Sequence, residues 1–422
     1  MTIQIQPGIT LTVIPTEKYK TIRLFARFSA KHTRQEAASR TLLTSILETN
    51  SLNYPTQTAL SAKLADLYGA SFGLNVGKRG NLHQVNLAMT VVNGKYINQP
   101  RVFAEAVAFL KEILFYPNIH DNQFEQQTFD LEKNNLIAYI ESIEEDKQSL
   151  ASLKLQELYF EDDDDQKTPS FGRVEELKKV TAQTLVHTYE KMLKEDQIDL
   201  FVVGDVTEEA VLEQMKELPF SQSERARFEM FYRQPQKNTV KEATLTENIL
   251  QGKLNLGYAT NIYYNGPERY ALMVFNGLFG GFPHSKLFMN VREKASLAYY
   301  ASSSIDTFRG FLSVQTGIDG KNRQAAMTLI GEQLEALCRG EVTEEELQKT
   351  KAMLKNQYLL SLDNPQALIE KAYLNVWLPE TKQNQEELIE NIMSVTKEEV
   401  QIVAQQIQLE SVFFLNGEQI DE

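Results

Sequence analysis

The side chains best suited to metal chemistry are few in this sequence and lie far apart. Its histidines are His32, His83, His120, His187 and His284, and no two of them lie within five residues of each other. A zinc site on a helix needs two imidazoles about one turn apart on the same face. The sequence offers no such pair, and we expect no metal site assembled from distant histidines.

Nucleophilic catalysis is not indicated either. Cys338, the only cysteine, lies in a helical apolar pattern with no histidine nearby in sequence, which favours a position in the core. No nucleophile elbow of the Gly-x-Ser-x-Gly type and no phosphate-binding glycine loop are expected. A single cysteine excludes an internal disulfide and is consistent with a reducing compartment. The sequence therefore predicts no self-contained catalytic site.

The elements that would position any site are arranged in two domains. A chain of 422 residues exceeds the usual size of one domain. The net charge of −14 argues against a nucleic-acid partner and against an anionic membrane surface. The stretch Met1–Ile14 alternates like a strand, and no apolar run approaches the ~18 residues that a membrane span needs. We expect a soluble, cytoplasmic protein.

The two halves repeat one order of elements. We predict an N-terminal domain over 1–220, a polar linker over 221–241 and a C-terminal domain over 242–422. The fold class is α+β, with two homologous domains, each an antiparallel-rich sheet covered by long helices. The best local match sets Asn122–Phe160 against Glu344–Leu378, with Lys133 opposite Lys355. The expected helices are Gln35–Leu47, Arg101–Leu114, Asn122–Ile143, Gln148–Tyr159, Glu268–Phe279, Arg323–Leu337, Thr343–Leu360 and Pro365–Trp377.

The most specific sequence motif of the chain lies in its second half. It reads Gly281-Phe-Pro-His-Ser-Lys-Leu-Phe-Met-Asn-Val-Arg-Glu-Lys-Ala-Ser-Leu-Ala-Tyr-Tyr300. Together with the duplicated halves and the linker it resembles the pitrilysin/insulinase family of zinc peptidases over nearly the whole chain. The resemblance implies two such domains arranged as half of a clam-shell. Lys286 replaces the family's usual Arg, Val291 a Leu and Ser296 a Gly. Arg292 and Tyr299 are retained, and the resemblance implies that this pair contacts substrate. A structural alternative is an Arg at a helix C-terminus and a Tyr packed on a sheet.

The same resemblance locates a degenerate zinc motif in the first half. The family's His-x-x-Glu-His falls on Arg40–Leu47, so Thr41 and Ser45 stand in place of the ligands and Thr44 in place of the general base. The third ligand falls within Glu132–Glu141, where one register places Tyr139. A neutral hydroxyl is a poor zinc ligand and Thr is not a carboxylate base. This chain is therefore expected to bind no metal and to be no enzyme on its own.

Three hypotheses follow from this resemblance. The first is a non-catalytic subunit of a heterodimeric metallopeptidase, whose homologous partner carries the zinc and accepts peptide substrate as an added strand. In that complex Arg292 and Tyr299 complete the partner's site. The second is a structural or peptide-binding scaffold without a peptidase role. The third is a peptide carrier that forms a homodimer when isolated.

Overall fold

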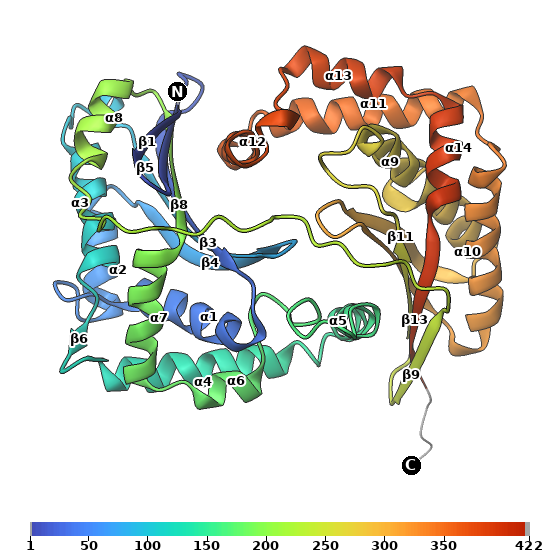
Figure 1. Cartoon of the computed structure of the whole chain (residues 1–422), viewed down its shortest axis with the longest axis horizontal. Helices are drawn as coiled ribbons and strands as arrows, with labels where there is room; N and C mark the ends of the chain where they lie inside the picture. The colour runs from blue at the N-terminus through green and yellow to red at the C-terminus, as the bar shows by residue number, and fades with distance from the viewer. Residues whose placement is uncertain (1, 418–422) are drawn as a thin grey trace. The chain divides into compact units, whose positions relative to one another are not determined.

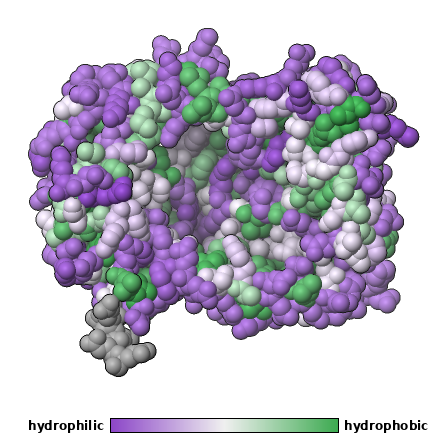
Figure 2. Space-filling model, turned by 180° about the vertical axis from the view of Figure 1, so that it is seen from behind, coloured by the Kyte–Doolittle hydropathy of each residue, from purple (hydrophilic) through white to green (hydrophobic). Residues whose placement is uncertain are grey.

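The computed structural model describes residues 2–417, which form two compact units (Figure 1). Unit 1 contains the chain up to Ser142, Thr168–Met230 and Pro365–Trp377. Unit 2 contains Ile143–Lys167, Phe231–Asn364 and the chain from Leu378 onward. One face of the molecule is mostly hydrophilic, with hydrophobic side chains in separate patches, in keeping with the acidic composition (Figure 2).

Unit 1 is built on a six-stranded sheet in the order β1-β2-β8-β3-β5-β4. All of its strand pairs are antiparallel except β2 with β8. The strands are β1 (Thr2–Gln6), β2 (Ile9–Pro15), β3 (Thr21–Lys31), β4 (Ser71–Arg79), β5 (Leu82–Val92) and β8 (Gln197–Gly204). The other elements are α1 (Arg34–Thr49), α2 (Gln57–Asp66), η1 (Gly94–Tyr96), α3 (Val102–Phe115), the hairpin β6 (Ile119–His120) and β7 (Gln123–Phe124), α4 (Gln126–Ser142), α6 (Val174–Lys179), α7 (Ala182–Glu195), α8 (Glu208–Met215) and α12 (Pro365–Trp377).

Unit 2 has a five-stranded sheet in the order β11-β12-β10-β13-β9, in which only β13 with β9 is parallel. The strands are β9 (Lys241–Glu247), β10 (Gly252–Ala259), β11 (Ala298–Asp306), β12 (Phe311–Ile318) and β13 (Gln408–Gly417). The helical elements are α5 (Lys147–Tyr159), α9 (Arg269–Asn276), the π-helices η2 (Gly277–Gly281) and η3 (Leu287–Lys294), η4 (Gly320–Asn322), α10 (Arg323–Cys338), α11 (Glu344–Ser361), η5 (Pro379–Thr381), α13 (Gln385–Ser394) and α14 (Lys397–Gln406). The α+β class with antiparallel-rich sheets is confirmed.

The internal repeat extends to single side chains. The Nζ atom of Lys133 on α4 donates to the carbonyl oxygen of Val180 at 2.7 Å, just after α6. The Nζ atom of Lys351 on α11 donates to the carbonyl oxygen of Val395 at 2.9 Å, just after α13. Each ammonium thus satisfies carbonyls at a helix C-terminus. The structure therefore pairs Lys133 with Lys351, and the predicted match to Lys355 is wrong by one helical turn.

One helix of each half belongs to the other unit. In unit 2, α5 packs Leu150, Ala151, Leu155 and Tyr159 against Phe311, Phe413 and Leu415 of the sheet. At Gly257 on β10, a Cβ atom would lie 2.5 Å from Ser411 Oγ and 3.1 Å from the Tyr159 ring, so a larger residue there would force Ser411 and the end of α5 to shift. The predicted domains, 1–220 and 242–422, are contiguous and place α5 in the first domain and α12 in the second. The compact units of the structure have these two helices the other way round.

In unit 1, α12 covers the sheet face opposite α1 with mostly polar contacts. Ile369, Tyr373 and Trp377, at spacing four, are its buried residues. Trp377 Nε1 donates to the buried Asp199 carboxylate at 2.8 Å. Glu370 accepts from Arg27 on β3 at 2.5 Å. The passage between the units at 230/231 lies in the stretch 216–240, which contains no helix or strand.

Two helices differ from the predictions at one boundary. The helix predicted over Asn122–Ile143 begins at Gln126, because the preceding residues form the β6–β7 hairpin. The helix predicted over Glu268–Phe279 stops being α-helical after Asn276 and continues as the π-helix η2.

Candidate functional site

The degenerate zinc motif lies on α1, the helix that packs on the unit 1 sheet. Its N-terminus is capped by Thr33, whose side chain accepts from the Glu36 amide. Thr41 and Thr44 are buried and Ser45 is half-buried. Thr41 Oγ1 donates to the Ala37 carbonyl at 2.9 Å, and Thr44 Oγ1 donates to the Thr41 carbonyl at 2.7 Å. Both hydroxyls are thus bonded back into their own helix.

The segment Thr168–Gly172, which turns back through a hydrogen bond from the Gly172 amide to the Pro169 carbonyl at 3.0 Å, packs on this part of α1. The carbonyl oxygen of Ser170 lies 3.4 Å from Thr41 Oγ1, which donates to it as a second acceptor. Gly172 has a φ of +80°, and a Cβ atom there would lie 2.4 Å from the Ala38 amide nitrogen. Glycine is therefore required both by the backbone conformation and by the close approach to α1.

Tyr139, which one register of the resemblance aligns with a third zinc ligand, contacts the same segment. Tyr139 on α4 is 57% exposed, and its ring lies edge-on to Phe171 with the ring centres 6.4 Å apart. Of the two acids that bracket the predicted range, Glu132 accepts from Thr49 at 3.1 Å and Glu141 is exposed. The positions that the resemblance aligns with zinc ligands thus carry hydroxyls and an aromatic ring, and they contact the main chain of Thr168–Gly172.

Two histidines that are far apart in the sequence meet in unit 1. The rings of His32 and His83 stack with centres 5.5 Å apart. His83 is fully buried; its Nδ1 accepts from Arg40 Nε at 3.0 Å and its Nε2 lies 2.8 Å from the Ser170 carbonyl. Because both ring nitrogens of His83 are engaged, the pair does not form a metal site. Burial, with Arg40 and His32 adding to it, holds the pKa of His83 well below its usual value, so the ring is neutral.

A buried ion pair holds this arrangement in place. Arg40 and Asp196 are 3% and 2% exposed, and Arg40 Nη2 lies 2.7 Å from Asp196 Oδ2. Neither this ion pair nor the segment Thr168–Gly172 was predicted from the sequence. A usable signal was Arg40 itself, because the seven residues after it on the helix are all apolar or carry hydroxyls and a buried arginine requires an acidic partner.

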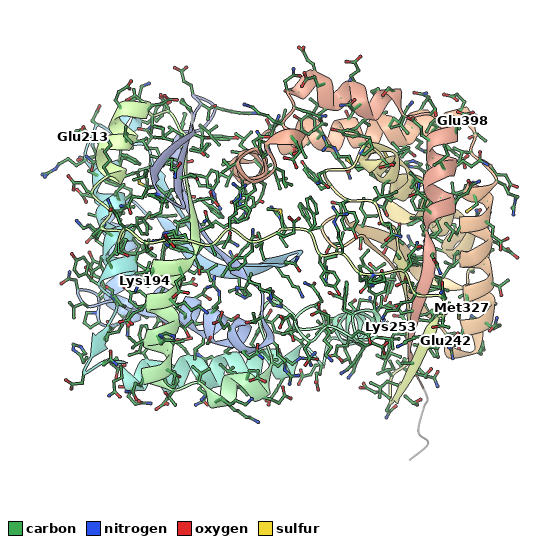
Figure 3. All side chains as sticks on the ribbon, viewed as in Figure 1. Lys194, Glu213, Glu242, Lys253, Met327 and Glu398 are labelled. Carbon is green, nitrogen blue, oxygen red and sulfur yellow. The ribbon has the colours of Figure 1, made fainter. Side chains whose placement is uncertain are left out.

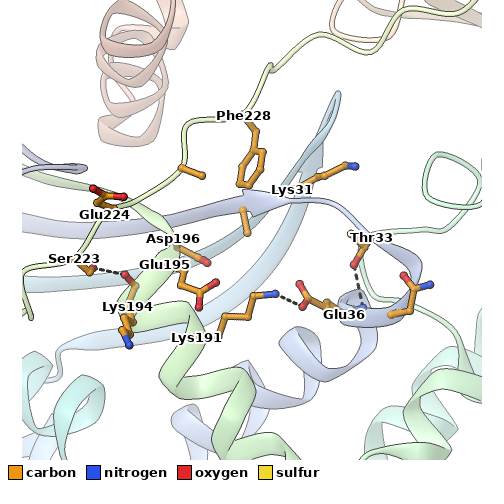
Figure 4. Close-up of a pocket in the computed structure, with 13 residues that line it drawn as sticks. Lys31, Thr33, Glu36, Lys191, Lys194, Glu195, Asp196, Ser223, Glu224 and Phe228 are labelled. Carbon is orange, nitrogen blue, oxygen red and sulfur yellow. Dashed lines mark hydrogen bonds and ion pairs between the residues drawn. The ribbon is translucent and has the colours of Figure 1, made fainter.

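A pocket of about 620 Å³ lies beside this network, between the end of β3, the start of α1 and the end of α7 (Figure 4). Its walls carry a Lys191–Glu36 ion pair and the Ser223 hydroxyl, which donates to the Lys194 carbonyl. Within residues 2–417, no three His, Cys, Asp or Glu side chains are grouped so that they could hold a metal.

Two further sequence features are settled by their structural context. Gly69-Ala-Ser71-Phe-Gly73 does match the Gly-x-Ser-x-Gly pattern, but it leads into the edge strand β4 and not into a helix. It is therefore no nucleophile elbow. Across the described part of the chain, no helix is both long and apolar enough to cross a bilayer.

The second-half motif separates into core residues and outward-facing residues. Leu287 and Val291 on η3 are fully buried in the unit 2 core. Arg292 on the same helix is 40% exposed at its side chain, with Nε 3.6 Å from Glu293 and the guanidinium carbon 4.5 Å from the centre of the Phe288 ring. The motif thus uses one face of η3 for packing and leaves its arginine accessible.

Tyr299 lies at an irregularity of the edge strand β11. Ala298 pairs with Ile318 and Tyr300 pairs with Gly317, so Tyr299 is the extra residue of a β-bulge. Its side chain is 67% exposed, and its hydroxyl makes no hydrogen bond within the described residues. Bulges redirect side chains and are frequent beside active sites. The geometry does not fit the alternative in which this tyrosine packs on the sheet.

The turn between Arg292 and Tyr299 depends on Ser296, which has a φ of +51°. Glycine adopts this left-handed backbone conformation without strain, whereas it costs other residues about 1 kcal/mol of conformational free energy. We expect Ser296→Gly to raise the free energy of unfolding by about 0.5–1 kcal/mol, measured by urea denaturation. Ser302→Gly, on the regular part of β11, is the matched control and should lower it. A loss of stability in Ser296→Gly would show that the serine makes compensating contacts.

Comparison with known proteins identifies the family. Residues 179–354 match the family described as "Peptidase M16 inactive domain". The chain is 35% identical over 414 residues to "Probable inactive metalloprotease YmfF" of Bacillus subtilis (strain 168), covering 97% of this chain and 96% of that protein. The chain belongs to the M16 (pitrilysin/insulinase) peptidase family.

Solved structures agree with this assignment. The crystal structure of a conserved protein from Enterococcus faecalis V583 is 55% identical, with a TM-score of 0.96 and coverage of 100% of this chain and 99% of that one. The peptidase M16 inactive domain from Pseudomonas fluorescens has the same fold, with a TM-score of 0.81 at 17% identity, over 99% of this chain and 98% of that one. This M16 chain is an inactive metallopeptidase homologue, as the substitutions on α1 predict.

Proposed function

We propose that this chain is the non-catalytic subunit of a heterodimeric zinc metallopeptidase, in which a homologous partner carries the His-x-x-Glu-His site and the zinc. The chain itself binds no metal and contributes substrate contacts through Arg292 and Tyr299. The proposal rests on the family membership and on the contrast between the two motifs. The first motif is packed against Thr168–Gly172, while the second keeps its polar side chains accessible.

The observation that carries the proposal is the exposed Tyr299 at a β-bulge. A large, 67% exposed aromatic side chain on a bulged edge strand contributes little to the stability of unit 2. Within residues 2–417, the ion pair and the ring contact of Arg292 are likewise with near neighbours in sequence, Glu293 and Phe288. An accessible hydroxyl and a guanidinium can both donate hydrogen bonds to a peptide carbonyl or carboxylate. Such donors suit a surface that binds peptide.

The proposal predicts that peptide cleavage requires both chains. The purified chain and a zinc-bearing homologue should be assayed for cleavage of a peptide library, separately and mixed. We expect Arg292→Ala and Tyr299→Phe to lower kcat/KM of the mixture by about 10- to 100-fold, since each loses hydrogen bonds made in the transition state.

Tyr116→Phe is the matched control, because this tyrosine is 45% exposed and lies in unit 1 outside either motif; it should leave kcat/KM unchanged. Cleavage by this chain alone with stoichiometric zinc would overturn the proposal. If the mixture is active and neither Arg292 nor Tyr299 matters, the chain is a scaffold and not a part of the substrate site.

A further inference from the structure

The strand β9 is an open edge of the unit 2 sheet. It is the last strand in the order β11-β12-β10-β13-β9 and pairs with β13 alone (Figure 1). Every one of its residues is exposed or half-buried, including Leu245, which is 37% exposed. Large apolar side chains flank it on both sides, with Val240 46% and Leu250 86% exposed.

The internal repeat shows what unit 2 lacks at this edge. In unit 1 the strand that pairs in parallel at the corresponding place is β2, which lies beside β8 as β9 lies beside β13. The outer edge of β2 is covered by β1 in antiparallel pairing. No described strand plays that role for β9. An unpaired edge presents a row of main-chain donors and acceptors to another strand.

The sequence of β9, Lys241-Glu-Ala-Thr-Leu-Thr-Glu247, is complementary to itself when reversed. In an antiparallel pair centred on Thr244, Lys241 of one copy faces Glu247 of the other at both ends. Ala243 then faces Leu245, and Glu242 faces Thr246. Directly opposite charges stabilise such pairs, whereas like charges destabilise them. Shifting the centre by half a residue toward the C-terminus would place Glu242 opposite Glu247, so the charges select one register.

From this geometry we infer that β9 is a homodimerisation edge, at which two copies of the chain join their unit 2 sheets by antiparallel β9–β9 pairing about a two-fold axis. The contact is isologous and closes on itself. It uses a short strand and is therefore a weak, salt-sensitive association.

The ion pairs that already involve these side chains are compatible with the contact. Lys241 contacts Glu161, and Lys147 Nζ lies 2.5 Å from Glu247. An ammonium has three donors and a carboxylate about four acceptor positions, so each group can take a second partner. The contact also lies at the opposite end of the sheet order from β11, the strand of Tyr299, and is thus independent of the proposed peptidase role.

The test is a charge exchange measured by sedimentation velocity on the full chain over a range of concentrations. Lys241→Glu places Glu opposite Glu twice, and Glu247→Lys places Lys opposite Lys twice. Each single variant should weaken self-association by about 10-fold or more. An equimolar mixture of the two variants should associate again, because each mixed pair regains both Lys–Glu contacts. The double variant Lys241→Glu/Glu247→Lys should self-associate like the native chain.

Glu242→Lys is the matched control, because this exposed side chain lies on the same strand but faces Thr246 in the inferred register (Figure 3). It should leave the association unchanged although it alters the net charge as much as Glu247→Lys. Thermal unfolding of each variant verifies that the monomer is intact. A native chain that stays monomeric at all concentrations, or a dimer that survives both single reversals, would overturn the inference.

Discussion

We expect the free energy of unfolding of the Asp196→Ala variant to be about 3 kcal/mol lower than that of the native chain. The substitution leaves the guanidinium of Arg40 buried without its carboxylate, and breaking a buried ion pair from one side costs about 3–5 kcal/mol. The native contact is bidentate, with Arg40 Nη1 and Nη2 at 3.2 and 2.7 Å from the two carboxylate oxygens. We expect the lower end of the range because Asp196 also lines the pocket of unit 1, from which water can reach the guanidinium.

Removing both partners should cost less than removing one. Arg40→Met/Asp196→Leu replaces the pair by apolar side chains of similar size and leaves no unpaired charge, so at least half of the loss should be recovered. Urea denaturation followed by tryptophan fluorescence is the suitable measurement, because Trp377, the only tryptophan, belongs to unit 1. A double variant as unstable as the sum of the two single variants would contradict this account.

The Asp196→Ala variant should also loosen the segment Thr168–Gly172, which packs on α1. Arg40 donates to Nδ1 of His83, which leaves the Nε2 proton to be donated to the Ser170 carbonyl. Without Asp196 the guanidinium is free to move, and the ring loses its fixed orientation. Amide hydrogen exchange over Thr168–Gly172 should therefore accelerate along with the loss of stability.

Acidification is the second large perturbation, and it should act on Glu370 of α12. Burial alone would raise the pKa of this carboxyl, but hydrogen bonds and charges of Arg27 and Arg79 outweigh that effect and lower the pKa to about 2 from 4.5. A carboxyl with a lowered folded-state pKa stabilises the protein above its unfolded pKa. That contribution, up to about 3 kcal/mol, is lost as the pH falls from about 4.5 to about 2.

The Glu370→Gln variant tests this directly. At pH 7 it should be less stable than the native chain by about 2–3 kcal/mol, because two guanidinium groups lose their carboxylate. Between pH 5 and pH 2 its stability should fall less steeply than that of the native chain. Glu380→Gln, an exposed carboxyl close in sequence, should behave like the native chain at every pH. Parallel pH profiles of Glu370→Gln and the native chain would show that Glu370 does not carry the effect.

The sequence predicts single elements better than their assignment to units. The boundaries of Pro365–Trp377 match α12 at both residues, because a proline at the first turn and a clear apolar spacing mark them. Nothing in that spacing tells which sheet the helix covers. Its partners Arg27 and Asp199 lie on strands of the other half, and polar contacts of this kind leave no periodic signal.

The candidate site, too, could be predicted from the sequence only in part. The placement of Thr41, Thr44 and Ser45 on one turn of a helix could be predicted from the local sequence, because these residues are close together in the chain. The covering of that turn by Thr168–Gly172 could not, because the contacts use main-chain carbonyls of a segment more than a hundred residues away. The outward orientation of Tyr299 likewise depends on a β-bulge, which is set by strand register and not by the residue types of the motif.

The exchange of α12 has a consequence for the order of events on the ribosome. Arg27 and Glu370 are separated by 343 residues, yet their contact belongs to the same unit. The unit 1 sheet therefore keeps one polar face uncovered until α12, Pro365–Trp377, has been synthesised. Neither half can complete its native structure when translated as a separate fragment. Completion of unit 1 is in that sense a late event, timed by the emergence of α12.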